Sequence, residues 1–575
     1  MLNSLKMKKI LFTLLAICSV TFAISDLPNQ QATTDINFWN PVLAKTWKGM
    51  IDRSITPYEN GVGGGLIHRP KSEYPGDAVS ESVGYGMLVA LYADDQATFN
   101  KIFSAANKNL WNGCFYDWHL LPSEKKEDGA ATDAEEDIIL SLIFAQKLVD
   151  VGLWVPFTYT FSSQQMSSMC SDQTSNTETT QERNYLDHAR FMMNSMWATA
   201  QITKSGILAP GAGWGGESFV NAGYFSPAWY KIFAKYDTKH DWNLVADRSY
   251  AIISNSPGYG IGLVPDWMTP AGKSAGSLGY NAYFSGEAFF KDAIRVLWRV
   301  AIDAVWFNDE RAIEFLTNAL TFIKKNGGAP ASNFFQMDGS LLPEDDVWKD
   351  LNGSKITRPR REHSPLTIAM WSTAATAVGT QEDRQSFSNE MKKFYDTDAD
   401  YFGLAVDPSG FGEDTLHNEM YFEQFLAWFG MSLMTGVFCN MEQIIDSLVE
   451  VSATAPVTVI DENGNAITKS PIHTALFKIY NSDNSEIATI GKKPNAYLSD
   501  NTIQVSHNGS SLTFFFAGTT KNSAVSWTIY NTKGKIVARM QGNNSSWNAS
   551  GYKGTFFVKA TDLNNHSTFK KFYLH

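Results

Sequence analysis

A helical spacing of apolar side chains runs through most of this chain, from about residue 37 to about residue 437. Roughly twelve helical segments lie within it, beginning near Asn37, Val79, Asp95, Thr132, Gln181, Ser226, His240, Lys291, Asn308, Ser364, Gln381 and His417. Gly- and Pro-rich connections separate the segments, and we find no fixed-period repeat of the kind that marks a solenoid. The pattern therefore predicts about six helical hairpins closed into an α/α toroid, although an irregular bundle would show the same spacing.

The pattern changes after Asn440, where short alternating strands replace the helices. Strands are predicted at 457–460, 512–516, 525–530, 535–540 and 556–560. We therefore divide the chain into a helical domain at 26–440, a linker with a short β segment at 441–495, and a sandwich-like all-β domain at 496–575. A Ser-, Thr- and Gln-rich stretch at 161–181 is expected to be a flexible surface insertion.

The N-terminus has the composition of an export signal. Lys6, Lys8 and Lys9 precede an apolar stretch at 10–23 that is too short to span a bilayer comfortably. Cleavage after Ala23 or Ser25 would leave small residues at the required positions. We therefore expect a signal peptide at 1–25 and a secreted mature protein, extracellular or on the cell surface, without a membrane span.

Composition narrows the class of ligand. A net charge of −12 argues against nucleic acid, because phosphate binding needs clustered Lys and Arg. The 17 Trp and 22 Tyr residues offer flat apolar faces with polar edges, which suit sugar rings. Outside the signal, Cys114, Cys170 and Cys439 form neither a disulfide framework nor a metal-ligand spacing, and whether any two of them pair stays open. We expect no metal and no other cofactor.

One short stretch concentrates four carboxylates ahead of an apolar helix. Asp133, Glu135, Glu136 and Asp137 lie within five residues. Thr132 with Glu135 three residues later fits a capping box, and acids in a first turn favour the positive end of the helix dipole. The run is therefore either a structural helix start or part of a carboxylate-rich active site.

Three more acidic motifs lie in loops or near predicted helix starts. Glu81 lies at a predicted helix start with glycines nearby, Asp266 precedes Trp267 in a rigid loop, and Asp292 lies three residues before Arg295. Each motif alone is usually structural. Asp266 and Trp267 are equally compatible with a loop scaffold and with a cleft wall.

Taken together and in order, these motifs resemble glycoside hydrolase family 8, and within it the bacterial endo-β-1,4-glucanases. The resemblance covers about residues 43–438 and rests on the following motifs: Ser80-Glu81 with Tyr85-Gly86, Tyr116-Asp117-Trp118-His119, Ala131-Thr132-Asp133 through Ile138, Trp214-Gly215-Gly216, Tyr224 through Tyr230, Gly262 through Trp267, Asp292-Ala293-Ile294-Arg295, and Tyr421 through Phe438. It implies an all-α (α/α)6 barrel and an inverting mechanism on β-1,4-linked glycans.

The resemblance also implies roles for individual residues. By motif, Glu81 matches the general acid, Asp292 the general base, and Asp133 the carboxylate that holds the distorted sugar. Inversion requires the acid and base carboxyl groups to stand ~6.5–9.5 Å apart, so that water fits between the base and the sugar. Five further positions match substrate-binding residues: Trp118 and Trp214 as stacking platforms, Tyr224 and Arg295 near the sugar and the base, and Tyr421 as a cleft tyrosine.

Simple electrostatics adds expectations for these carboxyl groups. A helix N-terminus lowers the pKa of a carboxyl group, so Glu81 needs burial or a nearby anion such as Asp133 to act as an acid. Arg295 is placed to keep Asp292 ionised. The chain departs from the family pattern at Ser82, where Gly is usual, and at Lys291, where an aromatic residue is usual. A Lys beside Asp292 could change its pKa or a contact with the sugar, so the identity of the substrate stays open.

The C-terminal strands resemble domains that address secreted proteins to a dedicated export system, through the motifs at 525–537 and 554–559. A carbohydrate-binding module is the alternative, with Trp527, Trp547 and Tyr552 as stacking residues, although alternating aromatics more often form a core.

The sequence thus favours an exported, monomeric, inverting endo-β-1,4-glucanase that acts on cellulose and related glucans and meets an export machinery through its C-terminal domain. Xylanase and mixed-linkage glucanase are the alternatives within the family, and chitosanase is disfavoured because Asp292 is retained. A toroid polysaccharide lyase and a non-catalytic glycan-binding protein are alternatives of other classes.

Overall fold

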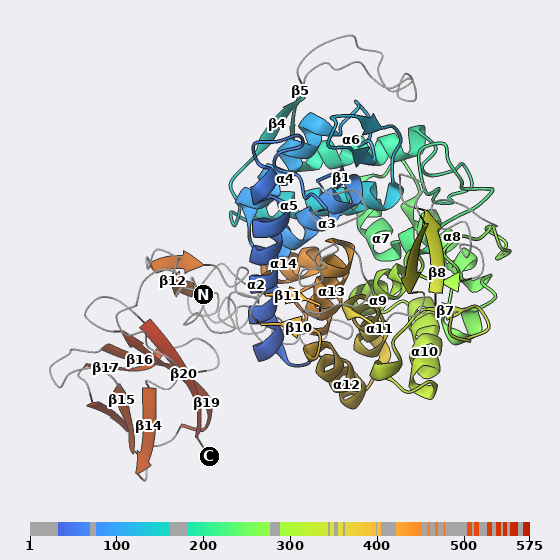
Figure 1. Ribbon diagram of the computed structural model, residues 1–575. Coiled ribbons are helices and arrows are strands. Elements are labelled where there is room, and N and C mark those ends of the chain that lie inside the picture. The colour runs from blue at the N-terminus through green and yellow to red at the C-terminus, as the bar shows by residue number, and fades with distance from the viewer. Residues whose placement is uncertain are drawn as a thin grey trace, which may run out of the picture. The chain divides into compact units, whose positions relative to one another are not determined.

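The structure is a computed structural model that describes most of the helical region and the C-terminal strands (Figure 1). The described residues are 33–69, 76–161, 181–275, 288–342, 345–349, 355–359, 363–397, 400–403, 421–449, 457–460, 466–469, 476–477, 503–508, 511–516, 526–531, 536–541, 544–548, 552–561 and 567–574. They form two compact units, one with the described residues up to 445 and 476–477, the other with the rest. The expected signal peptide, the middle of the 161–181 stretch and the helix start near His417 lie outside the described residues.

Six inner helices form a closed ring in the larger unit (Figure 1). They are α3 (Ser80–Tyr92), α5 (Thr132–Asp150), α7 (Pro227–Tyr236), α9 (Arg295–Phe307), α11 (Pro365–Val378) and α13 (Tyr421–Met434). Each contacts the next, and α13 contacts α3 to close the ring. Six outer helices pack on them: α2 (Ile36–Ser54) on α13, α4 (Gln96–Asn109) on α3, α6 (Tyr185–Ala198) on α5, α8 (Trp242–Ser254) on α7, α10 (Glu310–Lys325) on α9, and α12 (Gln381–Lys392) on α11. This is the six-hairpin arrangement that the spacing predicted.

Burial explains which helices lie inside. Nearly every side chain of α11 and α13 is buried, whereas the outer helices α10 and α12 expose one polar face. Aromatic rings fill the centre of the ring: Trp298 stacks on Phe429 at 4.6 Å, and Trp229 stacks on Trp306 at 5.3 Å between ring centroids. Apolar burial of this extent is the main source of stability for such a core.

A glycine allows α3 and α5 to approach closely. A Cβ atom at Gly84 would lie 2.8 Å from the Cβ of Asp137 on α5, closer than side-chain atoms pack. Gly84 follows Glu81 on α3, and Asp137 follows Asp133 on α5. The contact therefore sets the distance between the two helices that carry Glu81 and Asp133.

Helix ends agree with the sequence at some places and differ at others. The helix predicted near Ser364 begins there, and Ser364 forms a capping box with Thr367. The helix predicted near Gln181 begins at Tyr185 instead, because Gln181–Asn184 forms a strand. A further helix, α14 (Met441–Val449), occupies the start of the segment predicted as linker.

Short strands and 3-10 turns connect the helices. The strands of the larger unit pair as antiparallel sets: β1 (Ala78–Val79), β2 (His119–Leu120) and β3 (Lys126–Glu127); β4 (Thr158–Phe161) and β5 (Gln181–Asn184); β6 (Ala288–Phe289) and β7 (Phe335–Gln336); β8 (Asp345–Lys349) and β9 (Lys355–Pro359); β10 (Tyr395–Asp396) and β11 (Tyr401–Phe402). The 3-10 turns are η1 (Thr56–Tyr58), η3 (Ala222–Tyr224), η4 (Tyr259–Ile261) and η5 (Ala329–Ala331).

The smaller unit is built of antiparallel strands. One sheet has the order β14 (Ile503–Asn508), β15 (Ser511–Phe516), β18 (Asn544–Asn548), and another has β17 (Ile536–Gln541), β16 (Ser526–Asn531), β19 (Gly554–Thr561), β20 (Ser567–Leu574). A separate hairpin pairs β12 (Val457–Ile460) with β13 (Ala466–Lys469). Trp527, Ile529 and Val558 are buried, so strands β16 and β19 share an apolar face.

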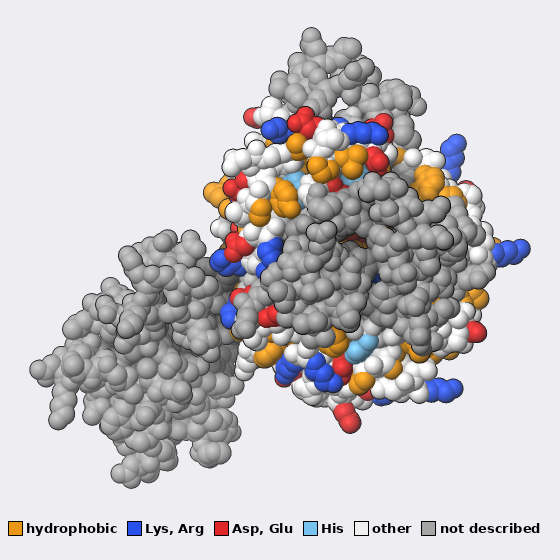
Figure 2. All heavy atoms as spheres, in the orientation of Figure 1, with side chains coloured by type: hydrophobic (Ala, Val, Ile, Leu, Met, Phe, Trp, Pro, Cys, Tyr) orange, Lys and Arg blue, Asp and Glu red, His pale blue; other side chains and the backbone are white. Residues whose placement is uncertain are grey.

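Two observations bear on the cysteines and on membranes. Cys114 is disulfide-bonded, and Cys439 is a buried thiol. No helix among the described residues is both long and apolar enough to cross a bilayer. In the face shown in Figure 2, the described surface mixes Lys and Arg with Asp and Glu rather than gathering one sign of charge.

Candidate active site

One guanidinium group, that of Arg295, binds three carboxylates from three parts of the chain. Its Nη1 donates to Oε2 of Glu81 at 2.6 Å and to Oδ2 of Asp133 at 2.8 Å. Its Nη2 donates to Oδ1 of Asp292 at 3.0 Å. The structure thus brings together the three carboxyl groups that the sequence singled out.

The barrel places these groups at one end of the ring. Glu81 and Asp133 lie in the first turns of the inner helices α3 and α5, and Tyr421 begins α13. Asp292 lies in a turn that leads into α9, which begins at Arg295 and not at the predicted Lys291. Inner helices that alternate with outer ones all run in the same direction, so their N-termini meet at one face of the barrel. Their dipoles add positive potential where these carboxylates gather.

The three carboxylates differ in access to water. The side chain of Asp133 is 1% exposed, that of Glu81 16%, and that of Asp292 33%. Asp292 can therefore contact solvent, whereas Asp133 is enclosed. The acid and base candidates are bound to different nitrogens of one guanidinium, an arrangement compatible with the ~6.5–9.5 Å separation that inversion requires.

Burial and mutual repulsion change the acidity of this group. Burial raises the pKa of Asp133 to about 7, helped by the nearby Glu81 and opposed by Arg295. Burial also raises the pKa of Asp292, and Arg295 and a hydrogen bond from Trp267 oppose that rise. Burial and the neighbouring carboxyl groups thus favour the protonated form of Asp133 more than water would.

Two tyrosines border the Arg295 cluster. The hydroxyl of Tyr421 donates to Oε1 of Glu81, so Glu81 is held from both sides. The Arg295 guanidinium lies over the ring of Tyr224, 4.8 Å from its centroid. Burial raises the pKa of both phenols well above the usual value, so both remain protonated donors at neutral pH.

The two predicted stacking residues have different surroundings. Trp214 is 45% exposed and packs edge-on against Trp267, with 5.3 Å between ring centroids. Trp118 is partly buried, and its carbonyl accepts from the backbone N–H of Ser80 at 2.9 Å, next to Glu81. Both rings are accessible enough to meet a ligand.

The remaining acids of the Asp133 run point into the interior. Glu135 accepts from the backbone N–H of Tyr116 at 2.8 Å, and Glu136 accepts from the hydroxyls of Ser226 and Tyr230 at 2.5 and 2.8 Å. Asp137 pairs with Arg299. These contacts give the three residues a structural role in joining α5 to its neighbours.

The predicted capping box of α5 is absent from the structure. The N-cap of α5 is Ala131, which makes no side-chain cap bond, and the Thr132 hydroxyl donates to the carbonyl of Ala209 instead, at 2.6 Å. Glu135 is occupied by Tyr116, as described above. The local pattern was misread because tertiary partners compete for both side chains.

Comparison with known proteins now identifies the larger unit. The family profile described as "Glycosyl hydrolases family 8" matches residues 59–174 and 175–333. Endoglucanase 2 of Ruminiclostridium josui is 30% identical over 370 residues, which is 63% of this chain and 68% of that protein. The chain belongs to glycosyl hydrolase family 8.

Two other relatives extend the family 8 comparison. Endoglucanase A of Acetivibrio thermocellus is 32% identical over 308 residues, 52% of this chain but only 57% of that protein, so the match spans little more than half of that relative. A solved structure of Rex8A from Paenibacillus barcinonensis, in complex with an arabinofuranosyl-xylotetraose, matches with a TM-score of 0.50 at 17% identity. That match covers 71% of this chain and 94% of Rex8A, and it supports the fold of the family 8 unit.

Sequence reasoning missed a second ionic cluster in this family 8 chain. Asp77 pairs with Arg69 and accepts from Nε2 of His119 at 2.6 Å, and Nδ1 of His119 bonds Glu127 at 2.9 Å. His119 was part of the Trp118 motif, but no spacing links Arg69, Asp77 and Glu127 in sequence. The cluster holds β1 and β2 together immediately before Glu81.

Lys291, the departure from the family 8 pattern, turns away from the base. Its Nζ bonds Oε1 of Glu423 at 3.0 Å, with both side chains mostly buried. Lys291 therefore ties the turn of Asp292 to α13, which also carries Tyr421.

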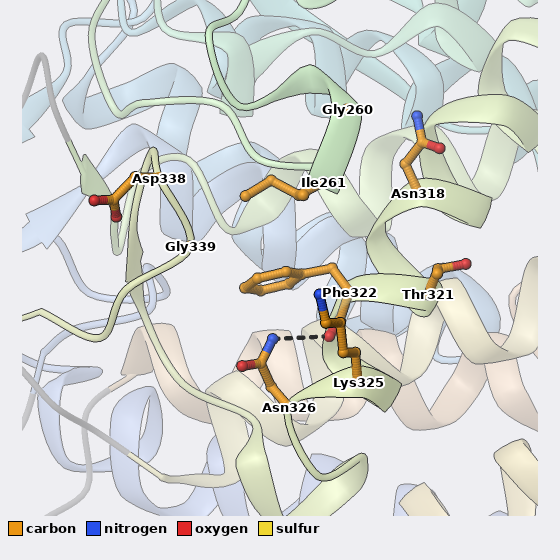
Figure 3. Close-up of a pocket in the computed structure, with 9 residues that line it drawn as sticks. All are labelled: Gly260, Ile261, Asn318, Thr321, Phe322, Lys325, Asn326, Asp338 and Gly339. Carbon is orange, nitrogen blue, oxygen red and sulfur yellow. Dashed lines mark hydrogen bonds between the residues drawn. The ribbon is translucent and has the colours of Figure 1, made fainter.

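Figure 3 shows a hollow of the larger unit with the side chains that line it. Its volume is about 440 Å³, and it is lined by residues of η4, α10 and the turn after β7, among them Ile261, Phe322 and Asp338. None of the three clustered carboxylates lines it. Among the described residues, no group of three or more His, Cys, Asp and Glu side chains is arranged to hold a metal ion.

Proposed function

We propose that this chain is an endo-acting β-1,4-glucanase that cleaves cellulose and related glucans with inversion at the anomeric carbon. The observation that carries the proposal is the Arg295 cluster, in which one cation holds a half-buried acid, an enclosed carboxyl group and a solvent-accessible base candidate. The likeness to endoglucanases at 30–32% identity supports glucan as the substrate class.

The proposed mechanism assigns one step to each group. Glu81 donates a proton to the leaving glycosidic oxygen, and its hydrogen bond from Tyr421 fixes that carboxyl group. Asp292, one-third exposed, removes a proton from a water molecule as the water attacks the opposite face of the sugar. Asp133 binds hydroxyls of the distorted sugar, with Arg295 and Tyr224 beside it. Trp118 and Trp214 stack on neighbouring glucose units.

The reaction stereochemistry and the substrate are tested together. Purified protein is incubated with carboxymethylcellulose, lichenan, xylan and chitosan, and the new reducing ends are followed by proton NMR. We expect α-anomers first, released from the two glucans. β-Anomers would contradict inversion, faster release from xylan would favour the xylanase alternative, and unsaturated products absorbing in the ultraviolet would indicate a lyase.

For the C-terminal strands, we propose a sandwich-like domain that serves export rather than glycan binding. Two of the three candidate stacking residues are buried, Trp527 at 0% and Trp547 at 7% exposure, and Tyr552 at 40% packs against Trp547. Sugar stacking needs open rings, so these positions favour a core role. We further propose a secreted, monomeric enzyme with a cleaved signal peptide. Binding to cellulose is measured for the Tyr552→Ala variant and for the unmodified chain. Equal binding of the two proteins would support the export role.

A further inference from the structure

The turn that carries Asp292 is held by a side chain outside it, that of Asp266. Oδ1 of Asp266 accepts from the backbone N–H of Phe290 at 3.1 Å and from that of Ala293 at 2.8 Å. The backbone N–H of Asp266 donates in turn to the carbonyl of Ala288 at 2.9 Å. Three hydrogen bonds thus join the Asp266 loop to the segment 288–293.

The helix that follows explains why this support is needed. The N-cap of α9 is Ile294, which has no side-chain acceptor for the free N–H groups of the first turn. Asp266 supplies an acceptor from a distant loop to the turn before the helix. On the other side, a Cβ atom at Gly223 would lie 2.0 Å from the carbonyl oxygen of Asp292, so the backbone of η3 closes against the turn.

The next residue, Trp267, reaches the carboxyl group itself. Its indole lowers the pKa of Asp292 as a hydrogen-bonding neighbour, while Arg295 Nη2 bonds Oδ1 of the same group. Trp267 is 6% exposed, so its ring is fixed by packing, including the edge-on contact with Trp214. Asp266 therefore acts on the backbone of the turn, and Trp267 acts on the side chain of Asp292.

We propose that Asp266 and Trp267 are positioning residues for the general base: Asp266 fixes the backbone of the 290–293 turn and Trp267 orients the Asp292 carboxylate toward the attacking water. This inference rests on the proposed hydrolytic function and adds two residues to it. Asp266 is fully buried, and its other oxygen, Oδ2, has no hydrogen-bond partner among the described residues. Burial and the adjacent Asp292 raise its pKa well above the usual value, and the hydrogen bonds from Ala293 and Phe290 oppose that rise.

A pair of substitutions at Asp266 separates positioning from charge. Asp266→Asn keeps an oxygen that can accept from Phe290 and Ala293, whereas Asp266→Ala leaves two buried N–H groups unsatisfied. We expect Asp266→Ala to lower kcat on carboxymethylcellulose about 10- to 100-fold with little change in KM, because misplacing a reacting group slows the chemical step. Asp266→Asn should stay within about threefold of the unmodified enzyme, since the same acceptor remains.

Two results would overturn the role of Asp266. The first is a wild-type kcat in Asp266→Ala, and the second is an equal loss in the Asn and Ala variants. Thermal melting identifies the folded temperature range of each variant, and all kinetics are measured within it. If the unmodified enzyme itself released no reducing ends from any glycan, the proposed function would fail, and that result is distinct from either of these.

The variant Trp267→Phe tests the contact between Trp267 and Asp292 through the pH dependence of kcat/KM. Asp292 faces Arg295, Asp133, Asp266 and Tyr224, and Lys291 precedes it. Removing the indole donor destabilises the ionised base, so the acidic limb of kcat/KM should move to higher pH. If Trp267 were only a cleft wall, Trp267→Phe would raise KM and leave that limb unmoved, which would refute its positioning role.

Discussion

Two rungs of charged side chains join α9 to α5, one helical turn apart. In the upper rung Arg295 bonds Asp133, and in the lower rung Arg299 bonds Asp137. The pairs use the same residue types at the same four-residue spacing on both helices. They differ in their surroundings: the lower rung is enclosed, whereas the upper rung also holds Glu81 and Asp292, which reach solvent.

The difference shows how one scaffold yields a structural and a reactive site. The upper rung has three carboxyl groups on one guanidinium, whereas the lower rung is a one-to-one pair with a further acid, Glu136, beside it. In the lower rung burial raises the pKa of Glu136 well above normal, and its bonds to Ser226 and Tyr230 enclose it. In the upper rung burial raises the pKa of Asp133 to about 7, and two of its neighbouring carboxyl groups reach solvent. An excess of carboxyl groups becomes catalytic only where substrate and water can reach it.

The largest expected effect is on turnover, from the upper rung. Glu81→Gln and Asp292→Asn should each lower kcat by ~10²–10⁴-fold, the usual contribution of a positioned acid or base. Glu136→Gln in the lower rung is the matched control, and it should keep activity within about threefold because Glu136 bonds Ser226 and Tyr230 rather than Arg295, and Gln keeps its shape and one acceptor oxygen. The measurement is reducing-end release from carboxymethylcellulose at saturating substrate.

The comparison would break down if the control lost as much activity as the upper-rung variants. It would also break down if either upper-rung variant retained activity within tenfold of the unmodified enzyme. The melting temperatures of Glu81→Gln and Asp292→Asn should match that of the unmodified chain or exceed it, because both remove negative charge from a crowded site.

The second expected effect is on stability, from the lower rung. Arg299→Met leaves Asp137 buried without its cation, and breaking a buried pair typically costs about 3–5 kcal/mol of unfolding free energy. The double variant Arg299→Met/Asp137→Leu should recover much of that loss, since an apolar replacement of a whole buried pair is often neutral. Urea unfolding of the two variants measures the difference. No recovery in the double variant would mean that Arg299 has another structural role.

The sequence predicted the six hairpins and the three clustered carboxylates for clear physical reasons. Apolar spacing records which helix faces are buried, and the motifs around Glu81, Asp133 and Asp292 carry family likeness. The sequence could not tell the two rungs apart, because Asp133 and Asp137 differ only in what distant segments place beside them. For the same reason the sequence did not decide the role of Asp266. The two backbone N–H groups that donate to its carboxyl group lie more than twenty residues further along the chain.

The same limit explains the capping box that the sequence predicted and the structure lacks. Thr132 and Glu135 have the right spacing, but a carbonyl from Ala209 and an N–H from Tyr116 take their side chains. Local motifs describe what a segment can do alone, and tertiary partners decide between the options.

The smallest expected effect is on the pH dependence of stability. Asp133 has a pKa of about 7 in the folded protein, above its usual 3.8, so between these values the folded state holds a proton that the unfolded state has lost. Its stabilising contribution is therefore complete below the usual pKa and is lost as the pH rises through about 7, with a slope of at most ~1.4 kcal/mol per pH unit. Asp133→Asn cannot ionise, so its unfolding free energy should fall less steeply between pH 5 and 7.

Glu135→Gln provides the matched comparison on the same helix. Burial raises the pKa of Glu135 to about 8, so that variant should flatten the profile over a window that reaches one pH unit higher. Urea unfolding from pH 5 to pH 8 measures both slopes. A full wild-type slope between pH 5 and 7 in Asp133→Asn would mean that Asp133 does not take up the proton. The contrast between the two rungs would then have to rest on access to solvent alone.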